Sequence, residues 1–137
     1  MKKILFVVAF ALPLSMFAQK APSAVQTAFK KRFPTVTKVG FDKEKNGEYE
    51  AEFKMNGVKM SANFTADGSW RETESEIAAT ALPVDVTKAI TAKFPKAKIV
   101  GAAKIETSDR GTIYEADLKT GMKNSEVLFD ASGNVVK

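Results

Sequence analysis

The sequence predicts an α+β fold in which a unit of one helix followed by antiparallel β-strands occurs twice. We expect the strands to form one continuous sheet with both helices packed on one face. Two observations lead to this prediction: residues alternate between charged and apolar on both sides of Asn56-Gly57, and a helix-and-strand pattern recurs in the second half of the chain. The 137 residues include no cysteine, so a packed core and not disulfides must stabilise the fold.

Residues 1–18 have the layout of a secretory signal peptide. Two lysines precede an apolar run over residues 4–14, and the small residue Ala18 ends the segment. A proline interrupts the run, which is also shorter than the roughly 20 residues that a membrane-spanning helix needs. We therefore expect cleavage near Ala18, a periplasmic or secreted location, no membrane span, and a single domain over residues 19–137.

The composition argues against several classes of function. The net charge of +5 falls to +3 without residues 1–18, and so small an excess in an exported protein does not indicate nucleic-acid binding. Without histidine or cysteine, a Ser-His-Asp or Cys-His arrangement and the usual zinc sites are excluded. We expect no enzyme, no cofactor and no metal site. Paired strand carboxylates such as Glu50 and Glu52 leave glycoside hydrolysis as an alternative.

Helical spacing predicts a first helix that opens at Pro22 and ends before Pro34. Apolar residues recur on one face of this helix, at Val25, Ala28, Phe29 and Phe33. Basic residues 30–32 fill its last turn, where cations complement the helix dipole, and an anion site there is the alternative. The same pattern returns in the second half of the chain, from Pro83 to Pro95.

The stretch from Tyr49 to Phe64 specifies its own pairing. It is centred on Asn56-Gly57, the residue pair best suited to a type I′ hairpin turn. A two-residue loop places Tyr49 opposite Phe64 and puts every alternating apolar residue on one face. A one-residue slip would turn all of them to water, so the register is strongly fixed.

Two further turns decide where Phe41 and Trp70 lie. A three-residue loop over residues 45–47 pairs Phe41 with Ala51 in the core, whereas a two-residue loop exposes it. The loop over residues 66–68 poses the same question for Trp70. We favour the three-residue loop at 45–47, because it keeps the apolar residues together, and we expect both aromatics in the core. If exposed, they would be candidates for a contact surface.

The strand pattern also returns, with a wider spacing from its helix than in the first half. Residues 49–53 are echoed by residues 114–118, and the additional residues fall between 105 and 112, which predicts a longer loop there. We infer two copies of one unit, over residues 22–77 and 83–137.

Each copy has about 55 residues, a size at which independent stability is marginal, so we expect the copies to share a core. The short connector over residues 78–82 argues against two freely moving domains. Glutamates alternate with polar residues from 70 to 77, and we interpret this segment as a solvated strand end, protected from aggregation by its charge.

The polar face of the predicted sheet is the candidate binding surface. It carries acidic residues, whereas lysines concentrate on the helices, and such asymmetry can steer a complementary partner. A broad sheet face suits a protein better than a small molecule, which prefers a concave pocket. The candidate partner-binding residues are Phe41, Glu50, Glu52, Asn63, Trp70, Glu115 and Asp117.

A set of motifs recurs in a fixed order along the chain, at Pro22, Val25, Ala28-Phe29, Phe33-Pro34, Gly47, Tyr49-Glu50-Ala51, Phe53, Asp67-Gly68, Trp70 and Leu82-Pro83. In this order the chain resembles the PepSY-like family of exported bacterial proteins, which is related in fold to the beta-lactamase inhibitor protein. The resemblance implies tandem repeats in the periplasm and binding or inhibition of a protein through the concave sheet face. This chain differs from the beta-lactamase inhibitor protein, which has disulfides, because it has no cysteine.

Residues and resemblance together predict a non-enzymatic periplasmic protein-binding module that inhibits a hydrolase or protease through its open sheet face. The alternative is a calcium-responsive periplasmic protein that uses the acidic strand residues.

Overall fold

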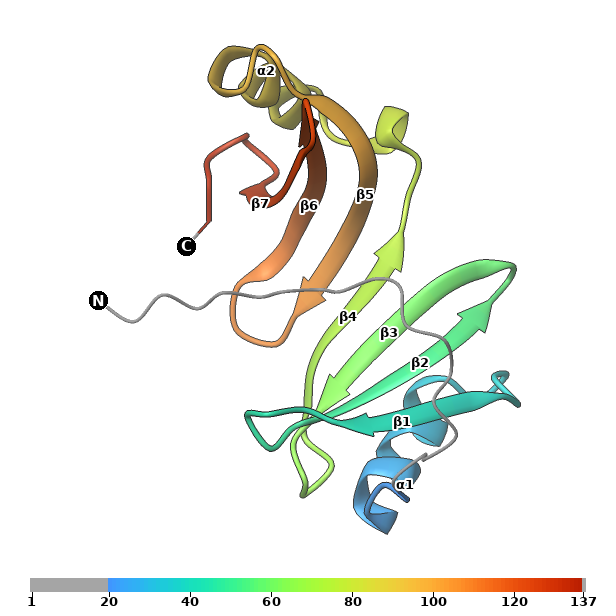
Figure 1. The fold of residues 1–137 in the computed structure, drawn as a ribbon. Coiled ribbons are helices and arrows are strands. Elements are labelled where there is room, and N and C mark those ends of the chain that lie inside the picture. The colour runs from blue at the N-terminus through green and yellow to red at the C-terminus, as the bar shows by residue number, and fades with distance from the viewer. Residues whose placement is uncertain (1–19, 137) are drawn as a thin grey trace.

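The computed structural model describes residues 20–136, so the predicted signal peptide lies outside the described residues. Its elements are α1 (Ser23–Arg32), β1 (Val39–Lys43), β2 (Tyr49–Met55), β3 (Val58–Phe64), β4 (Trp70–Glu76), a short 3-10 turn η1 (Ala79–Ala81), α2 (Val84–Lys93), β5 (Lys98–Thr107), β6 (Gly111–Thr120) and β7 (Lys123–Asp130). All seven strands form one antiparallel sheet in chain order (Figure 1). The predicted α+β class and the continuous sheet are confirmed.

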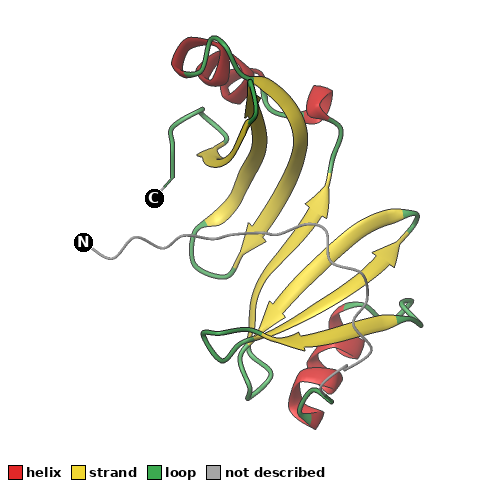
Figure 2. Cartoon of the chain, viewed as in Figure 1, coloured by secondary structure: helices red, strands yellow, loops and turns green. Residues whose placement is uncertain are grey.

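Both helices pack on the same face of this sheet. Paired residues lie on the same face of a sheet, so the strand register shows that one face contacts both helices. Met60 beside the first core pairs with Ser75, Ser75 pairs with Lys104, and Lys104 pairs with Tyr114 beside the second core. Figure 2 shows the two helices at opposite ends of the sheet. The opposite face, which we call the open face, therefore runs across both copies.

The two copies do not share one core, contrary to the expectation from their small size. One cluster lies beneath α1 around Phe29, and a second lies beneath α2 around Ile90. Phe29 is 1% exposed and stands edge-on to Phe53, with ring centroids 5.0 Å apart. The clusters stay separate because the helix side of β4 carries the hydroxyls of Thr73 and Ser75 in its middle, and its one large apolar side chain, Trp70 at the start of the strand, packs on the first cluster.

The turns of the first copy follow the predicted chemistry. Asn56 and Gly57 both have positive φ, at 52° and 79°, and Tyr49 pairs with Phe64 as expected. Phe41 pairs with Ala51, which confirms the three-residue loop at 45–47.

The second copy differs from the first in the length of its strands. β5 and β6 have ten residues each, and they pair as far as Thr107 and Gly111, so the additional residues lengthen the strands instead of the loop. The predicted longer loop is wrong, because Thr107 closes a short turn by donating its hydroxyl to the Gly111 carbonyl (2.8 Å). Beyond β7, the position that corresponds to β4 is reduced to a bridge between Phe129 and Val135.

The interpretation of residues 70–77 as a solvated strand end is also wrong. β4 is the central strand of the sheet, between β3 and β5, and it joins the two copies. The alternating glutamates of β4 therefore lie in the middle of the open face.

Candidate functional site

The open face is built from alternate residues of the strands, because successive side chains in a strand point to opposite faces. One row crosses it from Glu52 through Ser61 and Glu74 to Ile105. The open face brings together the acidic residues Glu50, Glu52, Glu72, Glu74, Glu115, Asp117 and Glu126.

The predicted partner-binding residues divide between the two faces. Five of them, the four acidic residues and Asn63, lie on the open face. Phe41 and Trp70 lie on the helix side, where both pack against the first core. The Arg32 guanidinium stacks 3.6 Å from the centroid of the Trp70 ring, and Trp70 Nε1–H donates to Thr73 Oγ1 (2.9 Å). The structure thus separates the aromatic candidates from the acidic ones.

In the first copy, Glu50 lies among other acidic residues. Burial, followed by repulsion from Glu44 and Glu52, raises the pKa of Glu50 from 4.5 to about 7. The Ser61 hydroxyl donates a hydrogen bond to Glu50 and partly opposes this shift. Glu50 thus carries a proton part of the time at neutral pH.

In the centre of the open face, β4 contributes glutamates that the sequence reasoning did not assign to the site. Burial, then repulsion from Glu72 and Glu50, raises the pKa of Glu74 from 4.5 to about 7. Burial also raises the pKa of Glu72, although Arg110 and Arg71 lower it. The signal was present in the sequence, because a continuous sheet needs a strand to join its two copies, and the alternation over residues 70–77 gives its phase.

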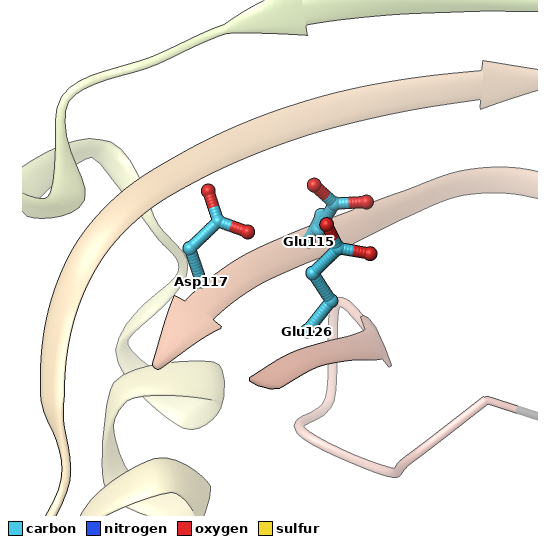
Figure 3. Close-up of side chains that lie close together, drawn as sticks. All are labelled: Glu115, Asp117 and Glu126. Carbon is cyan, nitrogen blue, oxygen red and sulfur yellow. The ribbon is translucent and has the colours of Figure 1, made fainter. Parts of the chain in front are cut away.

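In the second copy, Glu115, Asp117 and Glu126 project side by side from β6 and β7 (Figure 3). One carboxylate oxygen from each lies within 4.8 Å of the other two. Burial, then repulsion from Glu74, Glu126 and Asp117, raises the pKa of Glu115 from 4.5 to about 8. Burial also raises the pKa of Asp117.

Sequence reasoning missed Glu126. Its position follows from the repeat, because Glu126 corresponds to Ser61 just as Glu115 corresponds to Glu50, and Ser61 alternates with the apolar residues Met60 and Ala62.

The open face also carries apolar side chains. Ile105 and Ile113 pair with each other and are 5% and 3% exposed. The expectation of an entirely wet polar face is therefore too simple in the second copy. The phase of β6 already indicated this, because Ile113 and Glu115 are alternate residues of one strand and so lie on the same face.

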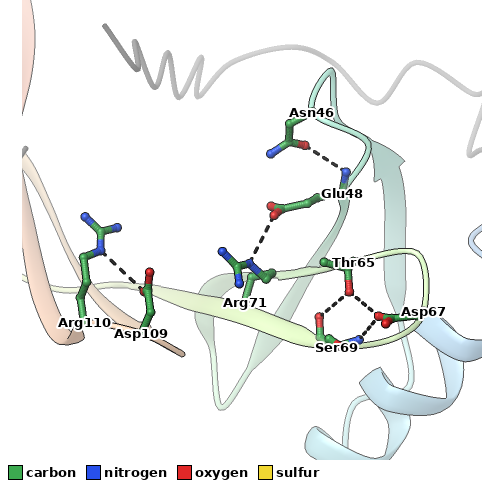
Figure 4. Close-up of polar contacts among 8 residues, drawn as sticks. All are labelled: Asn46, Glu48, Thr65, Asp67, Ser69, Arg71, Asp109 and Arg110. Carbon is green, nitrogen blue, oxygen red and sulfur yellow. Dashed lines mark hydrogen bonds and ion pairs between the residues drawn. The ribbon is translucent and has the colours of Figure 1, made fainter. Parts of the chain in front are cut away.

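Polar contacts fix the turns at the edge of the first copy (Figure 4). Arg71 Nε lies 3.4 Å from Glu48 Oε1, and the Glu48 backbone N–H donates to Asn46 Oδ1 (3.0 Å). In the next turn, the Thr65 hydroxyl donates to the Asp67 carboxylate. This bond, together with backbone donors, lowers the pKa of Asp67 to about 2. The turns are thus held by local contacts, and these contacts do not involve the acidic residues that form the open face.

Neither helix within residues 20–136 is long and apolar enough to cross a membrane.

Comparisons with known proteins identify the family. A family model described as "Putative beta-lactamase-inhibitor-like, PepSY-like" matches residues 12–61 and 47–137. No curated protein matches the chain.

Several solved structures share the fold. A "putative periplasmic" protein from Bacteroides eggerthii is 25% identical, with a TM-score of 0.77 over 86% of this chain and 87% of its own. A DUF2874 family protein from Bacteroides uniformis is 21% identical, with a TM-score of 0.78 over 86% and 88%. A BLIP-like protein from Bacteroides fragilis is 23% identical, with a TM-score of 0.71 over 93% and 86%. The family match over both copies, with this shared fold, shows that the chain belongs to the PepSY-like, beta-lactamase-inhibitor-like family.

Proposed function

We propose that this chain is a non-catalytic, periplasmic protein-binding module that docks a basic region of another exported protein on its open face and so inhibits a hydrolase or protease. The location is supported by the periplasmic description of the Bacteroides eggerthii structure and by the signal-peptide layout of residues 1–18, with cleavage near Ala18. The inhibitory role is supported by the family description.

The observation that carries the proposal is the clustering of carboxylates on one continuous surface. Glu50, Glu74 and Glu115 come from three different strands, and neighbouring carboxylates contribute to raising the pKa of each. Such a surface stores electrostatic repulsion. Lysine or arginine side chains of a partner would relieve it, because an opposite charge nearby favours the ionised carboxylate.

The charge pattern also defines the kinetics that such docking should have. An acidic surface attracts a basic partner over a distance set by the Debye length, about 8 Å at physiological ionic strength. Association should therefore slow as salt is added, whereas dissociation should change less. A non-catalytic role agrees with the absence of histidine and cysteine from the sequence.

The test compares two variants that change the net charge equally. Glu50→Lys/Glu52→Lys reverses two open-face carboxylates, and Asp85→Lys/Glu106→Lys reverses two on the helix side, whose side chains are 63% and 50% exposed. Each exported protein is used as bait in a periplasmic extract, and the recovered partner is then measured by surface plasmon resonance at two ionic strengths.

We expect the open-face variant to lose at least about tenfold in affinity, mainly through a slower association, as rim charges do in other interfaces. The helix-side variant should bind as the unaltered protein does. If both variants recover the same proteins with equal affinity, docking on the open face is refuted. If the recovered hydrolase or protease keeps its full activity when saturated, inhibition is refuted.

A further inference from the structure

The helix side of the sheet is hollowed between the two cores. A groove with a volume of about 510 Å³ lies over the middle of β4, between the end of α1 and strand β5, and the small side chains of Thr73 and Ser75 form its floor. This volume is within the range of sites that bind small molecules, about 300–1,000 Å³. The groove is lined by helix-side residues, so it lies across the sheet from the proposed docking surface.

One wall of the groove is apolar and adaptable. Met55 and Met60 are half-buried beside the first core, and the ring of Phe33 also lines the groove. Methionine side chains fit irregular apolar ligands, because they are unbranched and polarizable. The repeat places Thr120 and Ser125 at the positions of the two methionines in the second copy, so this wall belongs to the first copy alone. It suits the apolar body of a ligand.

A fixed cation, Arg32, lies at the same end of the groove. Its guanidinium stacks 3.6 Å from the centroid of the Trp70 ring. Stacking occupies one face of the planar guanidinium and leaves the N–H groups along its edge, which are suited to binding a carboxylate through two hydrogen bonds. Among the described residues Arg32 has no acidic partner. In the second copy Lys93 and Val135 stand at the positions of this stacked pair.

The remaining polar groups of the groove match an anion with a single charge. Lys104 and Glu106 neutralise each other through an ion pair of 3.0 Å, so Arg32 gives the lining a net charge of about +1. Thr73 accepts a hydrogen bond from Trp70, and within the part of the chain that the structure describes its own hydroxyl hydrogen has no acceptor. Since Arg32 and Thr73 both contact the Trp70 indole, their donors lie close together.

We infer that this groove binds a small amphiphilic carboxylate, a molecule with one carboxylate and a flexible apolar body. Arg32 binds the carboxylate through its free edge, and the Thr73 hydroxyl donates a hydrogen bond to it. Met55 and Met60 contact the apolar body. The inference does not depend on the proposed docking function, because the two surfaces lie on opposite faces of the sheet.

The test is an NMR titration of the exported protein carrying ¹³C-methyl methionine, with decanoate as the probe. Only three methionines follow residue 18, namely Met55, Met60 and Met122. Met122 is 100% exposed in the turn between β6 and β7, so it reports non-specific adsorption. We expect decanoate to shift the methyl signals of Met55 and Met60 saturably, with one site per chain, and to leave that of Met122 unchanged. Decyltrimethylammonium, which has the same chain and the opposite charge, should bind at least about tenfold more weakly.

Four variants locate the site. Arg32→Gln should weaken decanoate binding at least about tenfold, because it removes the charge-assisted hydrogen bonds. Arg32→Lys keeps the charge but loses the planar fork, so it should weaken binding by less. Lys31→Gln removes an equal charge from the neighbouring exposed residue of α1, which does not line the groove, and it should leave the affinity unchanged. Ser75→Leu fills the floor without changing the charge and should abolish binding, with thermal unfolding used to confirm that this variant is folded.

Three results would overturn the inference. One is the absence of a saturable shift at Met55 and Met60 below the concentration at which decanoate forms micelles. Another is equal affinity for decanoate and decyltrimethylammonium, or an equal shift at Met122, since either would indicate apolar adsorption only. The third is an equal loss of affinity in Lys31→Gln and Arg32→Gln, which would indicate diffuse attraction to a basic helix. None of these measurements involves a protein partner, so failure here is separate from failure of the docking proposal.

Discussion

Glu74→Gln should stabilise the protein at alkaline pH and have little effect at acidic pH. The pKa of Glu74 is about 7 in the folded protein, against an ordinary value of 4.5, mainly because the side chain is buried and secondly because Glu72 and Glu50 repel it. With rising pH, the unfolded chain ionises this group first, so folding loses stability between pH 4.5 and 7 and the loss is complete above pH 7. At about 1.4 kcal/mol per pH unit, the loss is about 3 kcal/mol at pH 8 and under about 1 kcal/mol at pH 5.

Urea unfolding in EDTA at the two pH values measures this difference directly. We expect Glu74→Gln to raise the free energy of unfolding by about 2–3 kcal/mol at pH 8, slightly less than the full loss because neighbouring carboxylates readjust their ionisation. Glu76→Gln is the matched control, since Glu76 is exposed and lies on the same strand and face. It should change stability by less than about 0.5 kcal/mol at either pH. A gain for Glu74→Gln that is absent at pH 8, or equal at both pH values, would refute the electrostatic account of the open face.

Two further predictions concern the first copy. Phe29→Ala should lower the free energy of unfolding by about 3–5 kcal/mol, because it empties the centre of the cluster in which Phe29 contacts Phe53; a loss below about 1 kcal/mol in urea unfolding would contradict this packing. Gly68→Ala should lower the free energy of unfolding more than Gly47→Ala does. Both glycines have φ near +90°, but only at Gly68 would the new Cβ lie 2.6 Å from the backbone oxygen of Ala24. We expect about 1 kcal/mol for Gly47→Ala and at least about 2 kcal/mol for Gly68→Ala, and equal values would exclude a tight contact between this turn and α1.

The features that the sequence predicted correctly are those encoded locally. Positive φ at Asn56 and Gly57, with period-two alternation on both sides, leaves one register for β2 and β3, and the structure has it. The repeat then transfers the predicted pairing to the equivalent strands of the second copy. The separation of the cores does not follow from local alternation alone, because it also requires the pairing of β4 with β5 across the connector, which places the hydroxyls of Thr73 and Ser75 between the two clusters.

The same distinction applies to the open face. Alternation correctly placed Glu50 and Asp117 on the face opposite the helices, because side-chain direction depends only on strand phase. The proximity of Glu126 to Asp117 depends on the β6–β7 register. The position of the Asp117 carboxylate over Gly101 depends on a local irregularity between β5 and β6. Such irregularities involve two strands at once and leave no mark in the alternation of either.

The separate cores on the two sides of β4 divide the molecule into two packed halves, here called plates, which share one sheet and meet at this strand. The relative tilt of the plates, and hence the spacing between Glu52 and Glu115, is governed by the twist of β4, where Thr73 is the buried residue. A change at Thr73 would therefore alter the spacing of distant acidic residues while both cores stay intact. A cavity made in one core would leave the shape of the other plate as it was.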